Sequence, residues 1–88
     1  MRVDYSPIFQ KRFKWLSTQD KDAVVETIDF FKDHPDDPSL RNHLLAAPMS
    51  GKRSISVRDD LRIIFIERWN YVQVLILDVW DHLTVYGI

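Results

Sequence analysis

Five side chains of this sequence are of the types that metal-free cleavage of RNA requires: His43, Asp60, Arg62, His82 and Tyr86. In that reaction the 2′-hydroxyl of the substrate attacks the neighbouring phosphate, so the protein must supply a base, an acid for the leaving oxygen and a cation for the phosphate charge. Histidine titrates in a suitable range, arginine matches phosphate with paired donors, and an aromatic ring can stack on a base. The residue types permit this chemistry, but their spacing alone does not show that the five side chains meet.

Other catalytic classes have little support in the sequence. The chain has no cysteine, which excludes a disulfide framework, a thiolate zinc site and a thiol nucleophile. Histidines and carboxylates do not recur at metal-ligand spacing, and only two glycines are present, so there is no glycine-rich phosphate loop. The spacing does not rule out a serine triad, but no nucleophile-elbow motif is present. We therefore expect no metal and no other cofactor, which leaves metal-free acid–base chemistry or binding.

Charge is unevenly distributed along the chain, although the net charge is only −1. Residues 18–37 contain seven acids and two bases, whereas residues 41–68 contain six bases and three acids. This split predicts one face that attracts phosphate, and the alternative, two solvated surfaces without a partner, has equal weight. RNA binding is assigned to four cations of the basic segment: Arg41, Lys52, Arg53 and Arg58.

Length and hydropathy indicate a small intracellular protein. A chain of 88 residues is expected to form a single domain, here residues 1–88. No run approaches the ~18 continuous apolar residues of a membrane span, and the N-terminus lacks the apolar centre of a signal peptide. We therefore expect a cytoplasmic location and no membrane contact.

Two consecutive helices are predicted in the N-terminal half. Ser6 followed by Pro7 is typical of an N-cap and a first helical residue, and apolar residues follow at helical spacing. Ser17 begins a second helix, with Asp20 three residues later as a weakened capping box. This helix should end near His34, because a residue before proline is displaced from the α region, and a cation there suits the helix dipole. The two helices form an αα-hairpin.

The periodicity changes from helical to two after an irregular segment at residues 35–51. Residues 53–57, 61–67 and 71–79 alternate and are separated by short turns, which predicts an antiparallel meander. Residues 3–5 are expected to form a short edge strand. We therefore predict an α+β fold, in which an N-terminal helical hairpin packs on a small antiparallel sheet.

Both faces of the predicted sheet are apolar. Leu61, Ile63 and Phe65 can face the helices, but alternation places a second apolar set on the opposite face: Ile64, Ile66, Leu75 and Leu77. A sheet with helices on one side should carry polar residues on the other. Either the chain's own tail and loop cover this second face, or a partner does.

Four segments in a fixed order resemble a known family: RNHL at 41–44, GKRSISV at 51–57, DLRIIF at 60–65, and DH at 81–82 followed by Tyr86. Their order and spacing resemble the RelE/ParE superfamily of toxins from bacterial type II toxin–antitoxin systems, and within it the YafQ-like branch. The resemblance covers nearly the whole chain. It implies a compact RelE-like fold and cleavage of mRNA in the ribosomal decoding site. It also implies a cognate antitoxin that wraps the sheet and fills the cleft, which would cover the second apolar face.

The resemblance gives each candidate residue a role. His43 matches the loop histidine, a general base or acid, and His82 and Tyr86 match the terminal histidine and aromatic. Asp60 matches the acid at the strand turn, and Arg62 matches the arginine that stabilises phosphate charge. The antitoxin would cover the second apolar set of the sheet.

The sequence also departs from the family at two cationic positions. Ser56 stands where YafQ-like enzymes have a histidine and RelE-like enzymes a lysine, and Asp78 replaces an arginine four residues before the terminal histidine. The pI near 6.2 is also low for a family of basic proteins. Two readings follow: an endoribonuclease toxin, or a ParE-like or catalytically degenerate toxin that acts by protein binding. A helix–sheet interaction module without toxin history is a third alternative.

Overall fold

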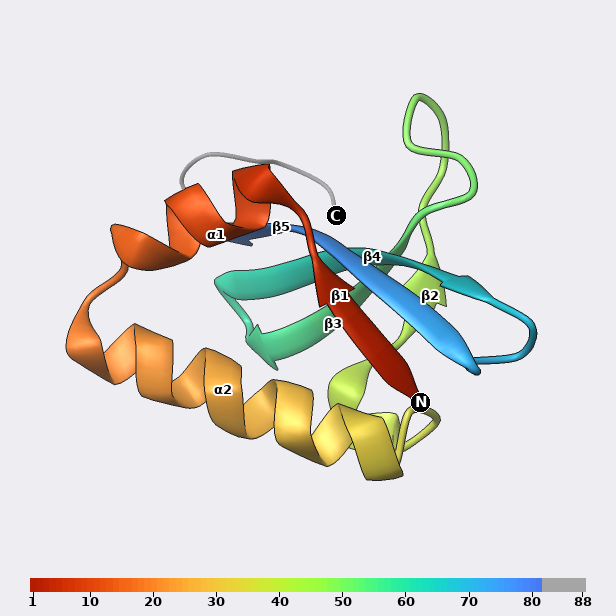
Figure 1. The fold of residues 1–88 in the computed structure, drawn as a ribbon, viewed down its shortest axis with the longest axis horizontal. Helices are drawn as coiled ribbons and strands as arrows, with labels where there is room; N and C mark the ends of the chain where they lie inside the picture. Colours follow the sequence, from red (N-terminus) through yellow and green to blue (C-terminus); the bar gives the residue numbers. More distant parts are fainter. Residues whose placement is uncertain (82–88) are drawn as a thin grey trace.

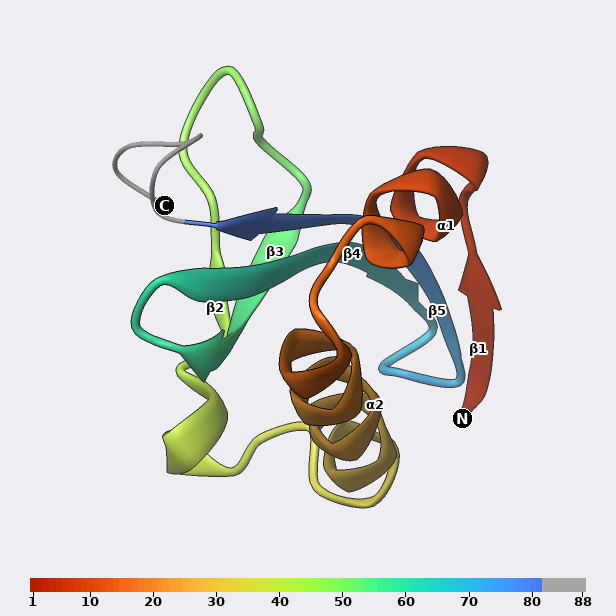
Figure 2. The same cartoon turned by 90° about the vertical axis from the view of Figure 1, so that its left-hand side faces the viewer.

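The computed structural model describes residues 1–81, which form two α-helices and a five-stranded sheet. In Figure 1 helix α2 (Thr18–Asp33) runs beneath the sheet, and helix α1 (Pro7–Lys14) lies at the end of the sheet beside its last strand. The view in Figure 2 shows that α2 covers a single face. The predicted α+β arrangement of a helical hairpin on a small sheet is confirmed.

The serine caps predicted for both helices are present. The hydroxyl of Ser6 accepts a hydrogen bond from the backbone N–H of Phe9 at 3.1 Å, and Ser17 accepts one from Asp20 at the same distance. Each bond satisfies a backbone donor that a helix N-terminus leaves without an intrahelical partner. At its C-terminus α2 is capped by His34, one residue before Pro35, as the proline rule predicts.

The sheet is mixed and has the order β1-β5-β4-β3-β2. Its strands are β1 (Arg2–Tyr5), β2 (His43–Leu44), β3 (Arg53–Arg58), β4 (Leu61–Arg68) and β5 (Gln73–Asp81). Strands β3, β4 and β5 form the predicted antiparallel meander, and β1 pairs with β5 in parallel at one edge. A β-bulge interrupts the pairing of β4 with β5 beside Ile64, so that both Leu77 and Asp78 lie opposite this residue.

The hydrophobic core lies between the sheet and the helices. Phe31 of α2 contacts Phe65 of β4 edge-on, with ring centroids 4.9 Å apart, and both side chains are fully buried. Ile55, Leu61 and Ile63 point to the same side of the sheet and belong to the same cluster. The face predicted to receive the helices is therefore the observed one, and the residues between them alternate to the other face.

Two short elements differ from the sequence prediction. The segment 35–51, expected to be irregular, contains a 3-10 turn at Pro38–Leu40 and strand β2, which places His43 on a strand rather than in a loop. The predicted edge strand β1 is present, but its parallel pairing makes the sheet mixed rather than purely antiparallel. Strands of two and four residues are too short to show a period, and the partner of β1 is distant in sequence.

Candidate functional site

The candidate site lies on the open face of the sheet, which we define as the face opposite the hydrophobic core. Paired residues of neighbouring strands point to the same side, so the register gives the members of this face. One row across the sheet runs from His43 through Ser54 and Ile64 to Asp78. The next row runs from Ser56 through Arg62 to Trp80.

The register places His43 and Arg62 on the same face. Their strands are separated by β3, and their rows are two residues apart. Standard strand spacing and rise then put their Cα atoms on the order of 12 Å apart. Side chains of this length can approach a common phosphate-sized group from two sides.

Arg62 is held by two contacts at the β3 side of the open face. Its guanidinium donates to the hydroxyl of Ser56 at 2.7 Å and to the backbone carbonyl of Asp59 at 3.3 Å. Ser56 is buried, and it stands at the position where the resemblance implies a cation. A serine brings no charge there, but its hydroxyl provides an acceptor that orients Arg62.

The imidazole of His43 is exposed and oriented by the backbone. Its Nδ1 lies 2.7 Å from the carbonyl oxygen of Arg41. Because a carbonyl can only accept, Nδ1 carries the hydrogen, and in the neutral ring Nε2 keeps the lone pair. This tautomer leaves Nε2 as a proton acceptor, which is the form that a general base needs.

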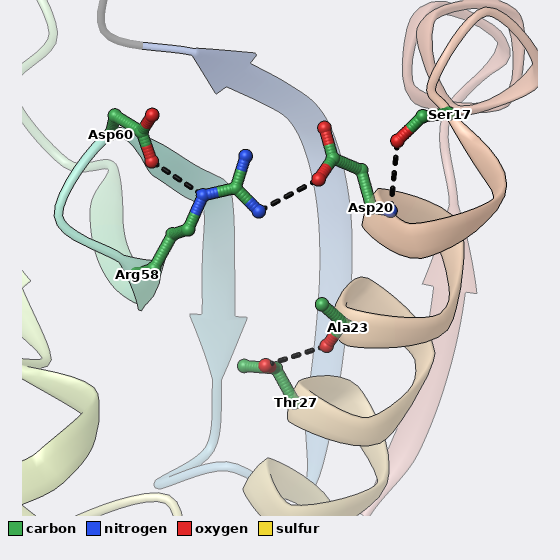
Figure 3. A network of polar contacts seen from close by, with 6 residues as sticks. All are labelled: Ser17, Asp20, Ala23, Thr27, Arg58 and Asp60. Carbon is green, nitrogen blue, oxygen red and sulfur yellow. Dashed lines mark hydrogen bonds and ion pairs between the residues drawn. The ribbon is translucent and has the colours of Figure 1, made fainter.

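Asp60 belongs to an ion-pair network at the N-terminal end of α2. Arg58 donates to Asp60 at 2.5 Å and to Asp20 of α2 at 2.7 Å, and so joins the β3–β4 turn to the helix (Figure 3). The hydrogen bond from Arg58 lowers the pKa of Asp20, and the same two carboxylates raise the pKa of Arg58. The structure therefore places the Asp60 carboxylate against Arg58 rather than beside Arg62 or His43.

The four cations assigned to RNA binding occupy different places. Lys52 lines a hollow of about 220 Å³ on the open face, together with Ile64 and Asp78. Arg53 points to the core side and donates to the side chain of Asn42 at 2.8 Å. Arg41 pairs with Asp59 at 3.1 Å, and Arg58 is held in the network at α2. Lys52 therefore borders the open-face hollow, and Arg41 shares Asp59 with Arg62, whose guanidinium donates to the carbonyl of that residue.

Arg12 and Trp80 also belong to the site, although no sequence motif marks them. The carboxylate of Asp78 forms an ion pair with Arg12 of α1 at 3.0 Å and accepts a hydrogen bond from the indole N–H of Trp80. The sequence does predict that Trp80 and Asp78 share a face, because alternate residues of a strand point to the same side of the sheet. The contact with Arg12 was not, because it depends on how α1 lies against β5.

The second apolar set is only partly covered by the chain. Ile64 is 1% exposed, whereas Ile66, Leu75 and Leu77 are half-buried. Ile66 and Leu75 line a shallow hollow of about 170 Å³ that also contains the charged residues Asp4 and Arg68. Residues 1–81 therefore leave an accessible apolar strip with charged borders on the open face.

The two C-terminal candidates, His82 and Tyr86, lie outside the described residues. Within residues 1–81, no group of three or more histidines or carboxylates has an arrangement that could hold a metal ion. In the same part of the chain, neither helix has the length and apolarity that crossing a membrane would need.

Solved toxin structures share this fold at low sequence identity. YafQ from E. coli matches with a TM-score of 0.79 and 17% identity, over 99% of this chain and 100% of that chain. The toxin–antitoxin complex RelBE2 from Mycobacterium tuberculosis matches with a TM-score of 0.72 and 22% identity, over 91% of this chain and 95% of that chain. The YoeB dimer from Staphylococcus aureus matches with a TM-score of 0.67 and 16% identity, over 93% of this chain and 97% of that chain. No family model and no curated protein sequence matches the chain.

The chain has the fold of the RelE/ParE-superfamily toxins, YafQ among them. The resemblance first drawn from short motifs is confirmed at this level, since the likeness extends over nearly the full length of the chain and of each neighbour.

Proposed function

We propose that this protein is the toxin of a type II toxin–antitoxin module and that it cleaves mRNA in the cytoplasm without a metal, which inhibits translation. The observation that carries the proposal is the shared open face of His43 and Arg62, with the His43 tautomer that leaves Nε2 as an acceptor. Arg62 would stabilise the charge that develops on the phosphate, and His43 would move a proton. His82 and Tyr86 would complete the site as the second proton-transfer group and a stacking aromatic.

Expression in a bacterial host and cleavage by the purified protein test this proposal. The wild-type chain should arrest growth and produce discrete cuts in mRNA, with ribosomes added in one arm and omitted in the other. Arg62→Ala, His43→Ala and His82→Ala should each lower cleavage, Arg62→Ala by roughly 10²-fold. Lys32→Ala is the control, because it removes one exposed positive charge from α2, which covers the opposite face of the sheet. Equal cleavage by all four variants would contradict the catalytic assignment.

The partner in this proposal is a cognate antitoxin that covers the apolar strip. Ile66, Leu75 and Leu77 would contribute its accessible surface, while Ile64 supports them from below. The neighbours that are toxin–antitoxin complexes support such a partner. Leu75→Glu should prevent co-purification with the protein encoded by the adjacent gene. Val25→Glu, at an exposed position of α2, should not. Retention of the partner by Leu75→Glu would reject this surface.

A second function is favoured by the residues at the two substituted positions. Ser56 and Asp78 both lie on the open face, at the two positions where the resemblance implies cations. A non-enzymatic toxin, which inhibits a target such as a DNA topoisomerase by binding, would not need them. Growth arrest that persists in Arg62→Ala and His82→Ala, without any mRNA cuts, would select this alternative.

A further inference from the structure

The indole of Trp80 lies beside the phosphate-binding candidate Arg62. The two residues are direct partners in the β4–β5 register, so their side chains leave the same face of the sheet as neighbours. Trp80 also borders the hollow of about 220 Å³ that Lys52 and Leu77 line. A flat aromatic ring thus lies beside one cation, Arg62, and lines a hollow together with a second, Lys52.

The orientation of the Trp80 ring is held by two successive hydrogen bonds through Asp78. Its indole N–H donates to one carboxylate oxygen of Asp78, and the other oxygen accepts from the backbone N–H of Val79 at 2.8 Å. The first contact uses the edge of the ring and the second holds the carboxylate that accepts it, so neither hydrogen bond involves a face of the ring. A ring held by its edge keeps the orientation that stacking requires.

Arg12 balances the charge of Asp78. The Asp78 side chain is only 13% exposed, and an unpaired carboxylate at that depth beside a phosphate site would repel the ligand. The guanidinium of Arg12, 3.0 Å away, pairs with it and brings a half-exposed cation from α1 to the same place. The acid therefore gives the ring an acceptor without leaving a net negative charge on the open face.

We propose that Trp80 is a stacking platform for one nucleobase of a single-stranded RNA and that Asp78 and Arg12 are its positioning residues. The proposal rests on the proposed function and adds a base-binding position to it. The base adjoining the phosphate held by Arg62 would lie flat on the indole, and Lys52 would approach the next phosphate. Stacking of this kind tolerates any base, because every base has a π-face.

A protein with Trp80 as its single tryptophan makes this contact observable. The chain has three tryptophans, and Trp15 and Trp69 are 81% and 71% exposed, so Trp15→Phe and Trp69→Phe leave the core unchanged. The probe is a short 2′-O-methyl oligoribonucleotide, which has no free 2′-hydroxyl and cannot be cleaved. We expect it to quench Trp80 fluorescence on binding. An abasic oligonucleotide of the same length, which keeps the charge but not the bases, should quench much less.

The affinity for the same 2′-O-methyl oligonucleotide, now carrying a fluorescent label, distinguishes a stacking contact of Trp80 from a purely apolar one. Trp80→Leu, which keeps an apolar side chain without a π-face, should bind about tenfold more weakly than wild type. Trp80→Phe should restore most of the loss. Equal affinity of wild type and Trp80→Leu, no quenching at saturation, or no binding at low salt would each overturn the proposal. mRNA cleavage by the same preparations would still stand, so the two proposals fail separately.

The positioning role has its own readout. Asp78→Ala removes the acceptor of the indole N–H, so we expect a lower fluorescence anisotropy of Trp80 and an affinity close to that of Trp80→Leu. Asp78→Asn keeps an acceptor oxygen and should restore the anisotropy, and Arg12→Met tests the counter-charge. A loss of thermal stability in Asp78→Ala, with anisotropy and affinity unchanged, would show that Asp78 has a structural role only.

Discussion

At the scale of single residues, the two serines of the open face have opposite situations. Ser56 accepts a hydrogen bond from Arg62, whereas the hydroxyl of Ser54 is buried and has no hydrogen-bond partner among residues 1–81. They lie two residues apart on one strand and are chemically identical. Substitution of Ser56 by alanine therefore tests a contact of the candidate site, and substitution of Ser54 tests the cost in stability of a buried hydroxyl without a partner.

Ser56→Ala should lower mRNA cleavage and leave folding nearly unchanged. A hydrogen bond to a charged group is worth about 1.5–3 kcal/mol when buried, and partial exposure of Arg62 reduces this, so a loss of about fivefold in rate is expected. Ser56→Thr keeps the hydroxyl and should restore the rate. Single-turnover cleavage of a reporter mRNA measures the effect, and an Ala variant as fast as wild type would show that Arg62 is oriented by other contacts.

Ser54→Ala should be neutral or stabilising, by up to about 1 kcal/mol. Removing a buried hydroxyl that makes no hydrogen bond removes its desolvation cost and leaves only a small loss of packing. Urea denaturation of the two proteins gives the difference. A destabilisation of more than about 1 kcal/mol would mean that the hydroxyl has a partner in the folded protein.

At the scale of elements, sequence patterns were sufficient where an element is long and amphipathic. The caps of both helices, the end of α2 before Pro35 and the alternation of β4 all follow from local chemistry, and the structure agrees. The shared face of His43 and Arg62 depends instead on β2, a two-residue strand that is too short to show a period. The bulge that turns both Leu77 and Asp78 toward Ile64, and with it the place of Arg12, has no local signal.

The two serine caps should differ in their contribution to stability. Ser17→Ala removes one N-cap hydrogen bond and should cost about 1 kcal/mol. Ser6→Ala should cost about 2 kcal/mol, because the Ser6 hydroxyl also donates to the backbone carbonyl of Leu77 and so joins α1 to β5. Denaturation midpoints of both variants test the order, and an equal cost would mean that the second contact contributes nothing.

The ion-pair network at α2 should make stability depend on pH in the acid range. The Arg58 hydrogen bond lowers the pKa of Asp20, so its contribution is complete above the unfolded-state pKa, near 3.8, and is lost as the pH falls through the folded-state value. Arg58→Met removes the cause of the shift. The free energy of unfolding of this variant should therefore fall less between pH 5 and pH 3 than that of wild type. Parallel curves would contradict the assignment.

At the scale of the whole molecule, the division of charge along the sequence becomes a division in space. Most acids of residues 18–37 are on α2, on the side of the sheet opposite the open face. The basic segment forms β3 and β4, but Arg41, Arg53 and Arg58 have partners within the chain. The number of cations directed at an RNA phosphate is therefore much smaller than the count of basic residues suggests.

RNA binding should consequently depend only weakly on salt. If Arg62 and Lys52 each neutralise one phosphate, the logarithm of the affinity should fall against the logarithm of salt concentration with a slope of about −1.4, because each contact on a single strand contributes about −0.7. Lys52→Ala should halve the slope, and Lys32→Ala, on α2 at the opposite face, should not change it. Titrations of the labelled 2′-O-methyl probe between low and physiological salt measure this directly. A slope near −4 would mean that the paired arginines release their carboxylates on binding, so that the network at α2 and the RNA site compete for the same cations.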